Sequence, residues 1–147
     1  MSNTHWLSII GIGDDGLDGL SAQARSALQE ADKIIGGERH HSLTSEFKGE
    51  RISWPSPFDV MLDVLEKSRH QKVVVLATGD PLWYSVGTRI LKSIRPEEIK
   101  FFPQISAFQW ASARMQWSMA DCNCLTVHGR EVVQILPDIA PNAKLLV

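Results

Sequence analysis

Cysteine is scarce in this sequence of 147 residues: Cys122 and Cys124 are its two cysteines, and they lie too close together to staple distant segments. We therefore expect thiols rather than a disulfide. No apolar stretch reaches the roughly 20 residues that a transmembrane helix needs. The residues before Trp6 lack the basic stretch and the cleavage site of a secretory signal. These absences predict a cytoplasmic protein with no membrane partner.

An excess of charge of one sign is missing as well. The 15 Lys and Arg residues nearly balance the 17 Asp and Glu residues, and no basic cluster stands out, which argues against nucleic acid as a partner. Repeats and low-complexity linkers are also absent. A hydrophobic fraction of 44% is ordinary for a globular protein. The length suits one domain, or one domain and part of another.

What the sequence does contain is a regular alternation of strand and helix patterns. The clearest unit is Lys72–Gly87, in which the apolar run 73–77 predicts a strand buried on both faces and a helical spacing of apolar residues begins at Val86. Further strands are expected at 6–10, 33–35, 51–54, 98–102, 124–127 and 143–147, and helices at 21–32, after Ser56-Pro57, at 105–115 and at 131–139. This alternation predicts an α/β fold, a mostly parallel open sheet with helices on both faces.

The loop Thr78-Gly79-Asp80-Pro81 is a candidate site, because ligands of open α/β sheets bind outside the carboxyl ends of the strands. Gly79 permits a positive φ and a close approach by a ligand. Pro81 keeps Asp80 out of the α region. A plain β-to-α turn would use the same residue types, so turn and site are equally favoured by this loop alone.

A second glycine loop, Gly11–Gly16, has the spacing G-x-G-x-x-G of a dinucleotide fingerprint, and Glu38 follows where a ribose-binding acid would stand. Two features weaken this interpretation. The segment 17–20 separates the last glycine from the helix whose N–H groups should face a pyrophosphate. Asp14 and Asp15 would also repel that pyrophosphate. An NAD(P)-dependent oxidoreductase therefore stays as the alternative, and a non-catalytic docking domain as a third possibility.

Four blocks of the sequence together resemble the tetrapyrrole (corrin and porphyrin) methylases. They are GIGDDGLDGLSAQARSALQEADKIIGG, VVVLATGDPLWYSVG, FFPQISAFQWASARM and LTVHGR. The acidic GIGDDG form and the following GGERH look most like the precorrin-6Y methyltransferases. In those enzymes, a part similar to the C5-specific cobalt-precorrin-7 methyltransferase is often joined to a C15-methylating, decarboxylating part.

The resemblance implies a two-domain enzyme that binds S-adenosylmethionine in the cleft between its domains and releases S-adenosylhomocysteine. The expected reaction is C5 methylation of a late precorrin in cobalamin biosynthesis, and family members are commonly homodimers. We expect the first domain at 1–118 and the beginning of a second at 119–147. The apolar run 144–147 stops without a polar tail, so we expect the chain to be part of a longer protein.

The resemblance also implies which residues line the donor site. These are Gly13, Asp14, Thr78, Gly79, Asp80, Trp83, Ser106, Ala107 and His128. The sequence departs from the family where Asp14 replaces a usual proline and where Gln104 replaces a common glycine. Arg39, Arg114 and Arg130 are candidate partners for the carboxylates of the substrate.

Methyl transfer from a sulfonium needs alignment and exclusion of water rather than a nucleophile or a metal. We therefore name no catalytic residue and no metal site. Cys122, Cys124 and His128 share one face of an expected strand, but three ligands on one strand seldom surround an ion, so buried thiols are the simpler interpretation. His40-His41 is expected to form a solvated helical turn.

Overall fold

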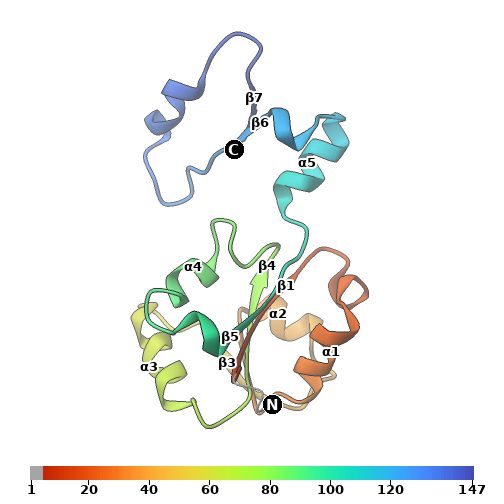
Figure 1. Ribbon diagram of the computed structural model, residues 1–147, viewed down its shortest axis with the longest axis vertical. Helices are drawn as coiled ribbons and strands as arrows, with labels where there is room; N and C mark the ends of the chain where they lie inside the picture. The colour runs from red at the N-terminus through yellow and green to blue at the C-terminus, as the bar shows by residue number, and fades with distance from the viewer. Residues whose placement is uncertain (1–4) are drawn as a thin grey trace. The chain divides into compact units, whose positions relative to one another are not determined.

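The structure, a computed structural model, describes residues 5–147 (Figure 1). The chain divides into two compact units, one up to Gln104 and one from Ile105 onward. The expected domain boundary after residue 118 stays a prediction; the compact units divide the chain earlier.

The first unit is built on a five-stranded sheet in the order β3-β2-β4-β1-β5. All four neighbouring pairs are parallel, which confirms the predicted fold class. The strands are β1 (Leu7–Ile12), β2 (Lys33–Gly36), β3 (Glu50–Ser53), β4 (Val73–Thr78) and β5 (Ile99–Phe102).

Helices cover both faces of this sheet, because alternate side chains of the strands point to opposite sides. Ile10, Ile12 and Leu76 pack on the side of α1 (Ala22–Gln29) and α2 (Glu38–Leu43). Leu7, Ile9 and Val75 pack on the side of α3 (Asp59–Lys67) and α4 (Val86–Ile90). Figure 1 shows the two pairs of helices on opposite sides of the strands. Strands β1 and β4 are therefore buried on both faces, as their unbroken apolar runs predict.

One predicted helix start is confirmed and one is wrong. Ser21 caps α1, and its hydroxyl accepts from the N–H of Ala24 at 3.1 Å. By contrast, α3 does not begin at Pro57; it begins at Asp59, with Phe58 in the N-cap position. The Phe58 ring stacks on Trp54, with 6.4 Å between the ring centroids. The helix thus begins two residues later than the Ser-Pro pattern indicates, directly after the residue that packs on Trp54.

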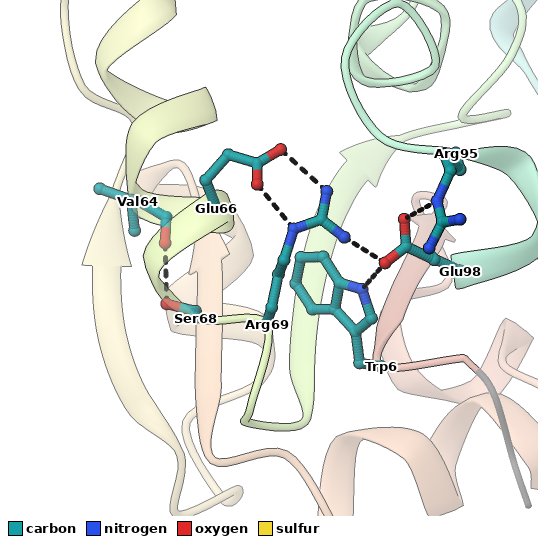
Figure 2. Close-up of polar contacts among 7 residues, drawn as sticks. All are labelled: Trp6, Val64, Glu66, Ser68, Arg69, Arg95 and Glu98. Atoms are coloured by element: carbon teal, nitrogen blue, oxygen red, sulfur yellow. Dashed lines mark hydrogen bonds and ion pairs between the residues drawn. The ribbon is translucent and has the colours of Figure 1, made fainter.

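A polar network closes the amino-terminal end of the sheet (Figure 2). Glu98, which is 9% exposed, accepts from the indole N–H of Trp6 at 3.0 Å and from Nε of Arg95 at 3.1 Å. Arg69 pairs with Glu98 and with Glu66. The hydrogen bond from Trp6, followed by the Arg95 and Arg69 charges, holds the pKa of Glu98 below its usual range. The network ties the segments that enter β1 and β5 to the end of α3.

The second unit contains α5 (Ala107–Met115) and a two-stranded parallel sheet of β6 (Cys122–Cys124) and β7 (Lys144–Leu146). The helix expected at 131–139 is a 3₁₀ helix, η4 (Val132–Asp138), with Pro137 inside it. The strand expected at 124–127 ends at Cys124. Among residues 5–147, no helix is long and apolar enough to cross a membrane.

Candidate functional site

The carboxyl ends of β1 and β4 lie side by side in the middle of the sheet. The two strands are parallel neighbours, and Ile12 at the end of β1 pairs with Thr78 at the end of β4. The helix after β1 goes to one face of the sheet, and the helix after β4 goes to the other. Strand ends from which the chain leaves in opposite directions form a topological switch point, the usual ligand position in open α/β sheets. The candidate site therefore lies between the loops that follow β1 and β4.

Two glycines let these loops touch. Gly79 has φ +66°, and its N–H donates to the carbonyl of Ile12 at 3.0 Å. A Cβ added at Gly11 would collide with the Gly79 carbonyl oxygen and lie 2.7 Å from Cβ of Gln104. The positive φ expected at Gly79 is present, and a side chain at Gly11 would push the strand ends apart.

The rest of the loop after β4 is held by its own backbone and by Asp80. One carboxylate oxygen of Asp80 accepts from the N–H of Leu82 at 2.8 Å, and the Asp80 carbonyl accepts from the N–H of Trp83 at 3.3 Å. The Trp83 side chain, 43% exposed, meets the Tyr84 ring edge-on at 6.4 Å between centroids. The predicted site residues of this loop are therefore placed on an ordered turn with an aromatic side chain at its surface.

The acidic loop after β1 carries arginine partners. Nη2 of Arg39 lies 3.1 Å from Oδ1 of Asp14 and 3.5 Å from the carbonyl oxygen of Gly13. Arg25 pairs with Asp18 at 3.7 Å. The Asp14 carboxylate is 91% exposed, so the ion pair between Arg39 and Asp14 contributes about 0–1 kcal/mol of stability. Its effect is to bring Arg39, expected to meet a substrate carboxylate, onto the loop of Gly13 and Asp14.

Gln104 adopts a defined position where the family commonly has glycine. Its Nε2 donates to the Gly19 carbonyl at 2.8 Å, which links the loop after β5 to the end of η1 (Gly16–Gly19). A cavity of about 230 Å³ lies beside this bond, lined also by Gly11 and Phe102. The extra side chain therefore braces the glycine loop from the β5 side.

His40 is not solvated, contrary to the expectation for His40-His41. The ring is 7% exposed, accepts at Nδ1 from the N–H of Gly37 at 3.1 Å, and lies with Nε2 2.9 Å from Oγ1 of Thr78. His41 places Nε2 3.0 Å from the carbonyl of Ile52. Burial of the ring lowers the pKa of His40, and the neighbouring Arg39 and His41 charges lower it further. Sequence reasoning missed this residue because polar side chains surround it in the chain.

Three of the predicted donor-site residues lie in the second unit. Ser106 is the buried N-cap of α5, and its hydroxyl accepts from the N–H of Phe108 at 3.2 Å. Ala107 is the exposed first residue of that helix, and His128 is exposed in a turn. The structure thus brings together Gly13, Asp14, Thr78, Gly79 and Asp80 in the first unit. The assignment of Ser106, Ala107 and His128 to the same site stays a prediction.

The geometry does not match a dinucleotide site. In the dinucleotide-binding fold β1 lies between β2 and β4; in this sheet β4 lies between β2 and β1. The last glycine of the fingerprint, Gly16, opens the 3₁₀ helix η1, and α1 begins only at Ala22. The N-terminus of α1, whose N–H groups would bind a pyrophosphate, therefore does not follow the glycine loop directly.

Comparison with known proteins points to one family. The sequence model of the tetrapyrrole (corrin/porphyrin) methylases matches residues 7–145. The chain is 36% identical over 142 residues to a decarboxylating precorrin-6Y C(5,15)-methyltransferase of Sinorhizobium sp, covering 96% of this chain and 34% of that protein. It is 34% identical to the cobalt-precorrin-7 C(5)-methyltransferase of Salmonella typhimurium, covering 84% of this chain and 62% of the relative.

A solved structure shows the same fold. The precorrin-6Y methylase of cobalamin biosynthesis from Archaeoglobus fulgidus superposes with a TM-score of 0.70 at 27% identity, over 88% of this chain and 68% of that one. The match of the family model over nearly the whole length, together with the switch-point loops, shows that the chain belongs to the tetrapyrrole (corrin/porphyrin) methylases.

Proposed function

We propose that this chain provides the donor-binding part of an enzyme that transfers a methyl group from S-adenosylmethionine to C5 of a late precorrin. The chain spans 34% and 62% of the length of the two curated relatives above. The activity and the substrate in this proposal are therefore taken from the names of those relatives. The observation that carries the proposal is the pair of glycine loops at the switch point of the sheet, in a chain whose fold resembles that of a solved precorrin-6Y methylase.

The residues at the switch point fit the methyl donor. S-adenosylmethionine supplies, when bound, a methyl group already activated on a sulfonium. Thr78 is an exposed residue and Asp80 is half-buried, so the hydroxyl and the carboxylate can both meet the polar amino-acid end or the ribose of such a ligand. The bare backbone of Gly79 lets the ligand approach closely. The task of these residues is to bind and orient the donor, and we assign no catalytic base.

The remaining parts of the proposal concern the substrate and the assembly. A precorrin carries several carboxylates, for which Arg39 in the first unit and Arg114 and Arg130 in the second are the proposed partners. A homodimer in the cytoplasm, with Ser106, Ala107 and His128 completing the donor site, is the expected working form. Nucleic acid has no place in this proposal.

Thermal unfolding with two ligands tests the proposal. S-adenosylhomocysteine should raise the melting temperature of the 147-residue chain, whereas NADH should leave it unchanged. At 100 times its dissociation constant, a ligand adds about 2.7 kcal/mol of stability. A rise with NADH and none with S-adenosylhomocysteine would restore the oxidoreductase alternative. If neither ligand raised the melting temperature, the remaining interpretation would be a non-catalytic docking domain.

A further inference from the structure

We propose that His40 is a positioning residue for donor binding. Its Nε2–H fixes the hydroxyl of Thr78 so that Thr78 donates its own proton to a carboxylate of the bound ligand, the one at the amino-acid end of the methyl donor. The inference rests on the proposed function and assigns a role to a buried histidine outside the predicted site.

The hydrogen bonds of the ring fix its tautomer. Nδ1 of His40 lies 3.1 Å from the backbone nitrogen of Gly37, and a backbone N–H can only donate. Nδ1 is therefore the acceptor and carries no proton. In a neutral imidazole the proton is then on Nε2, and at 2.9 Å from Oγ1 it donates to Thr78.

The packing around the ring keeps this arrangement. A Cβ on Gly36 would lie 2.9 Å from Cβ of His40, and a Cβ on Gly37 would lie 3.1 Å from Cδ1 of Trp54. The backbone of Gly36 therefore packs closely against His40, and the backbone of Gly37 packs against Trp54 beside it. Burial and the Arg39 and His41 charges lower the pKa of His40, which keeps the ring neutral.

The tautomer decides what Thr78 can bind. A hydroxyl has one proton and two lone pairs, and the bond from His40 uses a lone pair. The Thr78 proton then remains for a second bond, and Thr78 is an exposed residue beside Gly79 at the end of β4. A carboxylate accepts such a bond more strongly than a neutral group does. If Thr78 instead donated to the ring, it would offer a carboxylate only lone pairs.

Two substitutions at residue 40 separate the two bonds of the ring. In His40→Gln the amide nitrogen takes the place of Nε2 and can still donate to Thr78. In His40→Asn the amide oxygen takes the place of Nδ1 and can accept from Gly37, but the side chain is too short to reach Thr78. Calorimetry should show S-adenosylhomocysteine binding close to wild type for His40→Gln and weakened about tenfold for His40→Asn, because a hydrogen bond to a charged group is lost.

A shorter ligand tests the carboxylate. 5′-Methylthioadenosine has the nucleoside and the sulfur but lacks the amino-acid end, so its affinity should be the same for wild type and His40→Asn. Thr78→Ala should weaken S-adenosylhomocysteine as His40→Asn does, and the double variant should lose nothing more, since both changes remove one coupled contact. Melting temperatures of all variants report any change in folding.

Each result decides between the two proposals. If the wild-type chain does not bind S-adenosylhomocysteine, the proposed function fails. If it binds, and His40→Asn binds equally well or loses both ligands alike, the positioning role of His40 is overturned while the proposed function stands. Independent, additive losses for His40→Asn and Thr78→Ala would also overturn it.

Discussion

Gly11 and Gly79 meet where β1 and β4 end, and this contact is made by backbone atoms alone. The sequence could predict the role of Gly79, because a glycine before Asp-Pro at the end of an apolar run indicates a special φ. It could not predict the burial of His40, whose neighbours in the chain are polar. The contact with Thr78, 38 residues further along the chain, is made by the fold and is not visible in the local pattern.

At the residue scale, we predict that Gly79→Val abolishes the rise in melting temperature caused by S-adenosylhomocysteine. A β-branched side chain resists φ +66°, and it would also stand between the ligand and the loop backbone. The strain itself costs roughly 1–2 kcal/mol. Thermal unfolding with and without ligand measures both effects.

Gly16→Val is the matched control for this prediction. Gly16 also has a positive φ, +56°, and a Cβ there would meet the flexible side chain of Leu43 at 3.3 Å. The control should therefore lose stability to a similar degree and keep its response to the ligand. If Gly79→Val still responds like Gly16→Val, the loop after β4 is only a turn.

At the element scale, the site depends on a helix that is too short to be stable alone. α2 has 6 residues and carries Arg39 and His40. Its carboxyl end is closed from β3 by Arg51, which donates to Oγ1 of Thr44 at 2.7 Å, to the carbonyl of Phe47 at 2.7 Å and to the carbonyl of Thr44. The Arg51 guanidinium thus satisfies several acceptors at the carboxyl end of α2, the helix that positions Arg39 and His40.

We predict that Arg51→Lys lowers the free energy of unfolding by about 1–3 kcal/mol, because a lysine ammonium cannot serve these acceptors as a planar fork does. S-adenosylhomocysteine should also bind more weakly, since α2 would no longer hold His40 firmly. Urea unfolding and calorimetry measure the two effects. Arg95→Lys keeps a cation beside Glu98 at a side chain that is 70% exposed, so it should change the free energy of unfolding by about 1 kcal/mol or less. Equal effects of the two substitutions would show that Arg51 has no special role.

Local patterns predicted most elements of the sheet and the Ser21 cap, since unbroken apolar runs and cap residues carry their signal within a few positions. They failed where packing or proline decided the outcome. α3 starts two residues later than predicted, directly after Phe58, which stacks on Trp54. The segment 132–138 is a 3₁₀ helix containing Pro137, and apolar spacing alone does not distinguish a 3₁₀ turn from an α-helix.

At the scale of the whole molecule, we predict that the 147-residue chain gives no methyl transfer, whereas a chain extended to the length of the cobalt-precorrin-7 relative does. The chain covers 62% of that relative, so the remaining part of the donor and substrate sites would come from the extension. Alignment of two substrates can contribute roughly 7–11 kcal/mol of barrier lowering. An assay of both chains with labelled donor and the corresponding precorrin measures the difference. Equal turnover would place the whole active site within these residues.

The strand order also has a consequence for folding during synthesis on the ribosome. β1 is made first, yet both of its neighbours, β4 and β5, are the last strands of the sheet to be made. A growing chain therefore holds the apolar segment LSIIGI without its strand partners until Thr78 and then Phe102 have left the ribosome. Pairing across such long sequence separations is slow, and unpaired apolar strands favour association with other chains. β1 is thus the segment of this sheet that a chaperone would meet during synthesis.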